Sequence, residues 1–500
     1  MKRVDRLAAG LKQLGLKQGD RLGIWSPNNT EWLLASLAAS RIGLVVVAIN
    51  PAYQLDELKY ALQKVSVTAV ISPDRFKSRN YTEMLLDIQQ SCSSLKHIII
   101  HSEAHATSGT RRFADIENLA SRIEVEAIAR EQEKISCYDG CNIQFTSGTT
   151  GKPKATLISH KSVLNNARQA ASRSELDTER KVCLNVPLFH AFGLIMGQIA
   201  TLHAGSTVVV ESPTFDPVKS LEAMIREKCD VSFGTPTMWI NLMKAHERMQ
   251  PPTQSLVSGI TGGSPAPPEL FRRIRQCFRF ENIKTIYGLT ETTGIAFQSM
   301  PGEDKALTET TVGYISDHVE AMVVDDTGHP VAFDTPGELW IRGYSTMMRY
   351  WDDPESTKKT LTSDGWLKTG DRFVLQANGY GQIIGRSKDM LIRGGENIFP
   401  KEIEDFLMTH PAVLEVHVIG AHDEVYGEEI CACLRIRDGT KITKDDLKNY
   451  CKGKIAHFKV PRYIEFVEEY PKTGSGKIQK YLLKMAMEKK GIIPTAPPRS

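Results

Sequence analysis

At residues 146–154 the chain reads Thr146-Ser147-Gly148-Thr149-Thr150-Gly151-Lys152-Pro153-Lys154. Glycine lets the backbone turn and bring N–H groups close to a ligand, hydroxyl groups donate hydrogen bonds, and lysines supply positive charge. An apolar pair, Ile143 and Phe145, lies just upstream. The combination predicts a loop that binds phosphate groups, although a flexible hydroxyl-rich loop would have a similar composition.

This loop does not have the spacing of a P-loop. That motif places four residues between its glycines and a Ser or Thr after its Lys. Here two residues separate Gly148 from Gly151, and Pro153 follows Lys152. The spacing therefore disfavours a kinase or motor protein of the P-loop type.

The sequence around the loop alternates short β-branched runs with helical patterns. Runs typical of buried strands lie at residues 21–25, 44–49, 67–71, 98–100 and 207–210. An amphipathic helix is expected at residues 219–227, and turn residues crowd residues 336–385, which predicts hairpins. These patterns predict a large α/β domain over residues 1–388, with a first helix around Val4.

The pattern changes after Asp389. Helices are expected at residues 401–410 and 444–452, and strands at residues 413–418, 430–436 and 462–467. We therefore expect a small α+β domain over residues 389–490. The last ten residues contain three prolines, which predicts a loose tail over residues 491–500.

The composition argues against several classes of protein. With 62 basic and 59 acidic residues the net charge is +3, so no nucleic-acid partner and no membrane-surface binding are expected. The most apolar stretch, residues 188–202, is interrupted by polar residues and is too short to span a bilayer, so no integral membrane segment is expected. Nine cysteines without a CxxC pair predict neither a disulfide framework nor a zinc site and indicate a reducing compartment.

Four further motifs follow the loop. In order they read Tyr287-Gly288-Leu289-Thr290-Glu291, Thr369-Gly370-Asp371, Gly385-Arg386-Ser387-Lys388-Asp389 and Pro471-Lys472-Thr473-Gly474-Ser475-Gly476-Lys477-Ile478. Together with the loop, this series resembles the acyl-adenylate-forming superfamily of AMP-binding enzymes, over nearly the whole chain. Five further segments resemble the corresponding sequences of mitochondrial medium-chain acyl-CoA synthetases. They are residues 50–54, 234–238, 263–270, 393–398 and 427–433. The resemblance implies a large N-terminal domain with mostly parallel sheets and a small β-subdomain, followed by a small, mobile α+β domain.

The resemblance also implies an ATP-dependent fatty acid–CoA ligase. Such an enzyme activates a carboxylic acid, here a medium-chain one, as acyl-AMP with release of pyrophosphate, and then forms acyl-CoA and AMP. It uses ATP, Mg²⁺ and coenzyme A, so the expected partners are small molecules, and the oligomeric state is left open. Two alternatives remain: a catalytically impaired acyl- or nucleotide-binding protein, and an adenylating enzyme that passes the acyl group to a carrier protein or oxidises it.

The resemblance assigns the ATP site residue by residue. Residues 146–154 hold the β- and γ-phosphates, Thr290 contacts the α-phosphate, and Glu291 binds the magnesium ion. Gly263, Ser264 and Tyr287 border the adenine. Asp371 and Arg386 bind the ribose, and two carboxylate oxygens suit its vicinal hydroxyl groups.

Lys477 is the main catalytic residue that the resemblance implies, because it bridges the reacting carboxylate and the phosphate. His190 would stand at the wall between the acyl pocket and the pantetheine tunnel, although a core histidine is an alternative. The hinge between the domains falls at Asp389. Gly394, Gly395 and Lys454 would bind coenzyme A after the small domain rotates.

Two departures from the family pattern bear on activity and location. Ala155 follows the loop where the family usually has Gly, and alanine costs roughly 1 kcal/mol if that position needs a positive φ. Family members normally carry several dozen more residues before the first helix, including an import sequence in mitochondrial relatives. A mitochondrial location is expected by resemblance, and a cytoplasmic one if Met1 is the true start.

Overall fold

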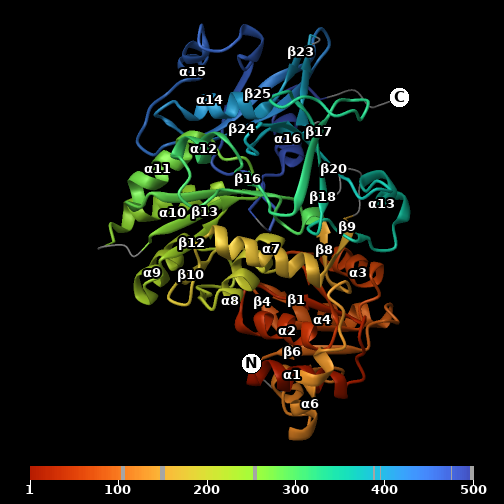
Figure 1. The fold of residues 1–500 in the computed structure, drawn as a ribbon. Coiled ribbons are helices and arrows are strands. Elements are labelled where there is room, and N and C mark those ends of the chain that lie inside the picture. The colour runs from red at the N-terminus through yellow and green to blue at the C-terminus, as the bar shows by residue number, and fades with distance from the viewer. Residues whose placement is uncertain are drawn as a thin grey trace.

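The computed structural model describes residues 1–102, 107–146, 153–251, 256–386, 389–394, 396–474 and 476–495. The chain begins in a sheet at the bottom of Figure 1 and continues through a second sheet in the middle and a smaller antiparallel sheet beside it. It ends in a small domain at the top. This arrangement confirms the predicted fold class of mostly parallel sheets, a small β-subdomain and a C-terminal α+β unit.

The first sheet is mostly parallel, with β8–β9 and β9–β19 pairing antiparallel. Its strands in spatial order are β19 (Arg349–Tyr350), β9 (Lys154–Ser159), β8 (Gly140–Thr146), β2 (Val45–Ile49), β1 (Arg21–Trp25), β3 (Ala69–Pro73), β6 (His97–His101) and β7 (Arg111–Arg112). This part of the chain also contains a short hairpin, formed by β4 (Arg75–Phe76) and β5 (Arg79–Asn80). Its helices are α1 (Lys2–Gln13), α2 (Thr30–Arg41), α3 (Leu55–Lys64), α4 (Tyr81–Gln90), α5 (Phe113–Ile116) and α6 (Arg122–Gln132).

Strand β2 shows why an uninterrupted apolar run forms a central strand. Its side chains point alternately to the two faces of the sheet. Val45, Val47 and Ile49 join one buried apolar cluster, and Val46 and Ala48 join another. Both faces of the sheet are therefore covered, which is why the strand has no polar positions.

The second sheet combines a parallel part with two antiparallel strands at one edge. Its strands in order are β11 (Thr207–Val209), β10 (Lys181–Leu184), β12 (Val231–Gly234), β13 (Ser258–Gly262), β14 (Asn282–Tyr287), β15 (Phe297–Gln298) and β16 (Tyr314–Ile315). The helical elements of this part are α7 (His160–Arg173), the π-helix η1 (Phe192–Ala200), α8 (Thr201–His203), α9 (Pro217–Glu227), α10 (Pro236–Met249), α11 (Pro268–Phe278), η2 (Thr290–Thr292) and α12 (Lys305–Thr310).

Two smaller units complete the chain. The antiparallel sheet consists of β17 (Val319–Val324), β18 (Gly337–Gly343), β20 (Leu367–Leu375) and β21 (Gly381–Arg386), with α13 (Pro354–Thr360) beside it. The small domain contains β22 (Leu391–Arg393), β23 (Glu396–Ile398), β24 (Val413–Asp423), β25 (Gly427–Ile436), β26 (Tyr463–Phe466), α14 (Pro400–Met408), α15 (Lys444–Cys451), η4 (His457–Lys459) and α16 (Lys480–Lys489).

Several of the predicted elements occur with shifted ends. The helix expected at residues 219–227 begins at Pro217, because the Asp216 carboxylate accepts hydrogen bonds from the backbone N–H groups of Val218 and Lys219. The prediction of a loose tail from residue 491 is wrong for its first residues. Ile493 is 3% exposed and lies in a buried cluster with Leu483 and Met487 of α16, so the packed chain extends beyond Gly491.

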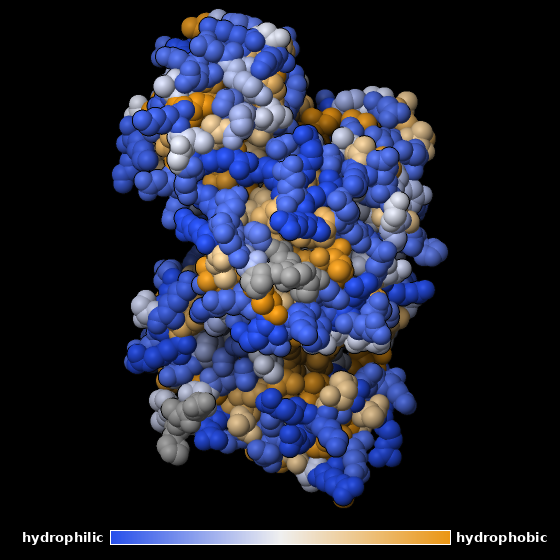
Figure 2. Space-filling view, turned by 90° about the vertical axis from the view of Figure 1, so that its left-hand side faces the viewer, coloured by the Kyte–Doolittle hydropathy of each residue, from blue (hydrophilic) through white to orange (hydrophobic). Residues whose placement is uncertain are grey.

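The surface and the helices bear on the prediction that the chain has no integral membrane segment. The face in Figure 2 is predominantly hydrophilic, with apolar residues in smaller interspersed groups. In the described part of the chain, no helix combines the length and the apolar composition that crossing a bilayer requires. The most apolar stretch of the sequence instead forms η1, whose Leu194, Ile195 and Met196 are buried in the core.

Candidate active site

Two paired strands flank the predicted phosphate loop. Strand β8 ends at Thr146 and β9 begins at Lys154, and these two residues are cross-strand partners. The Pro153 carbonyl accepts a hydrogen bond from the Tyr60 hydroxyl at 3.0 Å. The remaining predicted residues, Ser147, Gly148, Thr149, Thr150, Gly151 and Lys152, lie outside the described residues. The loop thus connects the two strands of a hairpin.

Ala155, where the family usually has Gly, adopts an ordinary strand conformation. This residue lies in β9 opposite Phe145, and its φ is not positive. Its methyl group is 1% exposed and belongs to the buried cluster that includes Ile143 and Leu157. Alanine therefore fits the backbone without strain, because the positive φ at which it would be unfavourable does not occur at this position.

Glu291 lies close to the base of this hairpin. It belongs to η2, the short turn after β14 that also contains Thr290. The Tyr350 hydroxyl donates a hydrogen bond to Glu291 Oε1 at 2.7 Å, and Lys154 Nζ lies 4.7 Å from the centre of the Tyr350 ring. Strand β19 places Tyr350 there by pairing with β9. Burial and the Glu291 carboxylate raise the pKa of Tyr350 above its usual range, so the hydroxyl remains a donor.

The sequence interpretation missed Tyr350. The aromatic pair Tyr350–Trp351 ahead of a turn was the available signal, but it lies 59 residues from Glu291 in the chain. No local pattern connects the two positions. The contact depends on β19 joining the edge of the first sheet.

The residues present suit a magnesium ion that is held mainly by its substrate. Among the described residues there is no cluster of three or more His, Cys, Asp or Glu side chains that would form an all-protein metal site. Mg²⁺ in nucleotide enzymes typically takes one or two carboxylates and completes its coordination with phosphate oxygens and water. Glu291, fixed by Tyr350 and close to Lys154 of the hairpin, fits this requirement.

The residues predicted to border the adenine lie at the carboxyl ends of neighbouring parallel strands. Thr235, Gly263 and Tyr287 stand at the ends of β12, β13 and β14, which pair in this order. Gly263 has a φ of +85°, a conformation that glycine adopts without strain, and Ser264 follows it. Ligands of open α/β sheets bind beyond the carboxyl ends of the strands, so this edge is a suitable nucleotide site.

Asp371 joins this edge from the antiparallel sheet. It is 1% exposed, and the Tyr287 hydroxyl donates a hydrogen bond to its Oδ2 at 2.6 Å. Asp371 and Arg386 are cross-strand partners in β20 and β21. The structure therefore brings three of the predicted nucleotide-binding positions together, from segments about a hundred residues apart.

The loop that carries Lys477 is a tight turn seated against the large domain. The Thr473 hydroxyl accepts a hydrogen bond from the Lys477 N–H at 3.0 Å, and an isolated bridge pairs Lys472 with Ile478. A Cβ atom added to Gly474 would lie 2.9 Å from Asn50 Oδ1 and 3.0 Å from Phe189 Cζ. A larger residue at this point would have to displace the side chain of Asn50 or Phe189, because the two domains approach closely.

His190 follows Phe189, the residue that the Lys477 loop approaches at Gly474. Burial and then the positive charge of Lys477 lower the pKa of His190 to about 4, so the imidazole is neutral at pH 7. Its Nδ1 accepts a hydrogen bond from the Phe192 N–H at 3.2 Å, which places the ring proton on Nε2. His190 stands two residues before the apolar helix η1, and the structure thus brings the segments of two predicted catalytic residues close together.

The predicted coenzyme A residues lie elsewhere. Gly394 stands in the exposed turn between β22 and β23, and Lys454 Nζ lies 3.9 Å from the centre of the Tyr450 ring of α15. In Figure 1, β23 and α15 are at the top of the small domain, far from the large domain. Gly395 lies outside the described residues, and Asp389 lies between β21 and β22. In this arrangement the loop of Lys477 contacts the large domain, whereas the turn between β22 and β23 lies at the far end of the small domain.

Comparison with protein families gives two matches. Residues 1–351 match the model of the AMP-binding enzyme family, and residues 402–477 match that of the AMP-binding enzyme C-terminal domain. The medium-chain acyl-CoA ligase ACSF2, mitochondrial, of Danio rerio is 43% identical over 97% of this chain and 82% of its own length. The Homo sapiens protein of the same name is 39% identical with the same coverage.

Solved structures show the same architecture. The anthranilate CoA ligase AuaEII in complex with anthranoyl-AMP superimposes with a TM-score of 0.86 at 25% identity, covering 98% of this chain and 92% of that chain. ATP-bound MatB from Rhodopseudomonas palustris superimposes with a TM-score of 0.85 at 27% identity, covering 98% and 93%.

Proposed function

The chain belongs to the AMP-binding enzyme family, and from this premise we propose that it is an ATP-dependent, AMP-forming medium-chain fatty acid–CoA ligase. It first converts a carboxylic acid and ATP to acyl-AMP and pyrophosphate. It then transfers the acyl group to the thiol of coenzyme A and releases AMP. The medium chain length follows the relatives named above.

One observation in particular supports the proposal. The loop that carries Lys477 approaches Phe189, next to His190, while Asp371, Tyr287 and Gly263 lie at the carboxyl edge of the second sheet. The loop of Lys477 also reaches the end of β12 at this edge, because a Cβ atom added to Gly476 would lie 3.3 Å from Thr235 Oγ1. The arrangement suits the joining of a carboxylate to a nucleotide.

The first step needs positioning and charge neutralisation. An oxygen of the carboxylate attacks the α-phosphorus of ATP, and the bond from that phosphorus to pyrophosphate breaks. Lys477 contributes positive charge between carboxylate and phosphate, and Thr290 contacts the α-phosphate. Asp371 and Arg386 hold the ribose, and Thr146 to Lys154 holds the outer phosphates. Preorganised charges of this kind supply much of the catalysis in enzymes.

Glu291 would hold the magnesium ion, which when bound neutralises charge on the phosphate oxygens. Tyr350 holds the Glu291 carboxylate in place through its hydroxyl. His190 adds no charge to the site at pH 7, because its pKa is about 4. It serves as an uncharged wall between the acyl pocket and the pantetheine tunnel.

The second step needs a different face of the small domain. The thiol sulfur of coenzyme A attacks the acyl carbonyl carbon, the carbon–oxygen bond to AMP breaks, and the thiol proton is released. Rotation at Asp389 would withdraw Lys477 and bring Gly394, Gly395 and Lys454 toward the adenylate. Such rigid rotation concentrates the backbone change in a few hinge residues.

The alternative of a catalytically impaired binding protein is not favoured. Of the two departures that supported it, the shorter N-terminal part and Ala155, the second lies unstrained in β9. We further propose a mitochondrial location, which the names of the relatives support.

Pyrophosphate release measured over a panel of C2 to C18 acids, with and without coenzyme A, tests the function. The proposal requires acid-dependent release that peaks for medium-chain acids, and acyl-CoA and AMP in equal amounts when coenzyme A is present. Absence of release for every acid in the panel would refute it.

A further inference from the structure

Strand β24 of the small domain contains a β-bulge where it meets the large domain. Val413 pairs with Ile436 and Glu415 pairs with Arg435, so Leu414 is an extra residue in the strand. Successive side chains of a regular strand point to opposite faces, and a bulge changes this alternation. Val413 and Val416 lie in the core of the small domain, whereas Leu414 and Glu415 both face the large domain.

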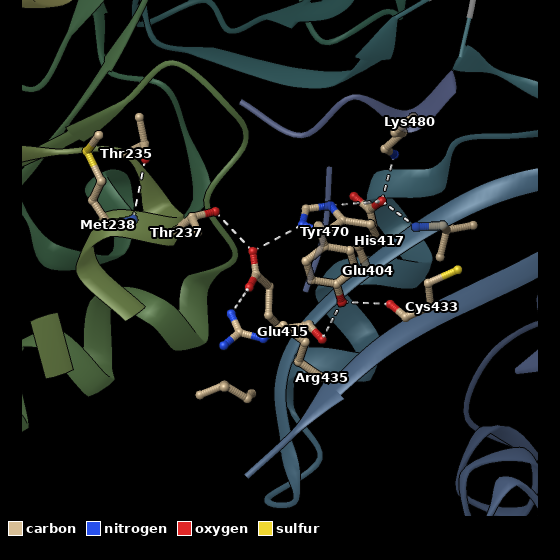
Figure 3. A network of polar contacts seen from close by, with 12 residues as sticks. Thr235, Thr237, Met238, Glu404, Glu415, His417, Cys433, Arg435, Tyr470 and Lys480 are labelled. Atoms are coloured by element: carbon tan, nitrogen blue, oxygen red, sulfur yellow. Dashed lines mark hydrogen bonds and ion pairs between the residues drawn. The ribbon is translucent and has the colours of Figure 1, made fainter. Parts of the chain in front are cut away.

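These two consecutive residues dock onto helices of the large domain. Leu414 belongs to the buried apolar cluster of the large domain that contains Trp239 and Phe271. The Arg273 guanidinium of α11 donates a hydrogen bond to the Leu414 carbonyl at 3.4 Å. The Thr237 hydroxyl, in the first turn of α10, donates a hydrogen bond to Glu415 Oε1 at 3.0 Å (Figure 3).

The small domain holds the Glu415 carboxylate rigidly. Arg435 Nη1 donates to Glu415 Oε2 at 2.8 Å, and His417 Nε2 lies 3.3 Å from Oε1. The Tyr470 hydroxyl donates to the main-chain carbonyls of Glu415 and Cys433, at 3.1 and 2.9 Å. Figure 3 shows these side chains converging on Glu415, with Thr237 approaching from the other domain. A fixed acceptor makes the cross-domain hydrogen bond sensitive to the domain orientation.

The same turn of α10 also contacts the loop that carries Lys477. Thr235 caps α10, and a Cβ atom added to Gly476 would lie 3.3 Å from Thr235 Oγ1. Tyr470, which holds the Glu415 backbone, directly precedes that loop. The N-terminal end of α10 therefore contacts both the Glu415 carboxylate and Gly476, the residue that precedes Lys477.

We propose that Thr237 and Glu415 are positioning residues for Lys477. Their hydrogen bond, seated by the bulge at Leu414, holds the small domain in the orientation that forms acyl-adenylate, and it must break before the small domain can rotate for the coenzyme A step. The proposal rests on the two-step function proposed above. Thr237 touches no reacting atom and acts through the small domain.

The test compares Thr237→Val, which removes the hydroxyl without changing the shape, with Thr237→Ser, which keeps it. Thr308→Val is the matched control, because Thr308 also donates to a carboxylate, that of Glu303, but within the large domain. Single-turnover rates are measured for each half-reaction separately: acyl-adenylate formation from acid and ATP, and acyl-CoA formation from supplied acyl-AMP.

We expect Thr237→Val to slow adenylate formation about tenfold, as loss of a hydrogen bond to a charged group implies. Acyl-CoA formation from supplied acyl-AMP should be as fast as in the wild type or faster, and Thr237→Ser should restore adenylate formation. Thr308→Val should leave the ratio of the two rates unchanged.

Three results would overturn the proposal: equal slowing of both half-reactions in Thr237→Val, no slowing of either, or the same change of the ratio in Thr308→Val. If the wild type itself forms no acyl-adenylate, the proposed function fails first and the positioning role fails with it. Melting curves of all three variants show whether each is folded when its rates are measured.

Discussion

Removing the Tyr350 hydroxyl tests the assignment of Glu291 as the magnesium ligand. The hydroxyl donates to Glu291 Oε1 at 2.7 Å, and Tyr350 is 4% exposed, so water replaces the donor poorly in Tyr350→Phe. A hydrogen bond to a charged acceptor typically contributes 1.5–3 kcal/mol. At the lower end of that range, a loss of about 1.5 kcal/mol corresponds to about a tenfold change in an equilibrium constant.

The assay is acid-dependent pyrophosphate release as a function of Mg²⁺ concentration at saturating ATP. We expect Tyr350→Phe to raise the Mg²⁺ concentration at half-maximal rate about tenfold, because Glu291 is no longer held in place. The phenylalanine ring keeps the face that Lys154 covers, so the cation–π contact survives the change.

Tyr380→Phe is the matched control for this experiment. Tyr380 also donates to a carboxylate, Glu303 Oε2 at 3.2 Å, but outside the candidate site. Its removal should leave the Mg²⁺ dependence unchanged. An unchanged Mg²⁺ dependence in Tyr350→Phe, or an equal shift in both variants, would refute the assignment of Glu291.

The remaining predictions concern the nucleotide, the catalytic lysine and the hinge. Lys477→Ala should lower adenylate formation by orders of magnitude while acyl-CoA formation from supplied acyl-AMP persists; equal loss of both rates in single-turnover assays would make Lys477 structural or shared. Asp371→Ala should raise the KM for ATP strongly in a protein with normal melting, because two charge-assisted hydrogen bonds to the ribose are lost; an unchanged KM would exclude the ribose assignment. Asp389→Pro fixes φ near −65° and should retain acid-dependent pyrophosphate exchange while acyl-CoA production collapses; production at the wild-type rate would place the hinge elsewhere.

The large elements were predictable because burial dictates their composition. Strand β1 has the bounds 21–25 that its apolar run predicts, and β6 extends the expected run of isoleucines by a histidine at each end. The stripe of Val4, Leu7, Ala8 and Leu11 is buried in α1, as its helical spacing predicts. Local periodicity determines such elements, since each residue position reflects the face on which it packs.

The structural features that the sequence did not predict depend on contacts between distant segments. The bulge at Leu414 interrupts an alternating strand, and its reason lies in the large domain, where Leu414 is buried. Tyr350 approaches Glu291 because β19 joins β9. Helix α16 was not foreseen, and with it the burial of Ile493. The domain boundary and the roles of the site residues remain predictions that the experiments above test.

An isotope-transfer measurement tests the central claim most directly. The protein is incubated with ATP, Mg²⁺, coenzyme A and a medium-chain acid labelled with ¹⁸O in both carboxylate oxygens, and the products are analysed by mass spectrometry. If the carboxylate attacks the α-phosphorus and coenzyme A later breaks the acyl carbon–oxygen bond, each turnover leaves one ¹⁸O atom in AMP and none in pyrophosphate. Formation of ADP with ¹⁸O in inorganic phosphate, or acyl-CoA formation with unlabelled AMP, would contradict the acyl-adenylate mechanism.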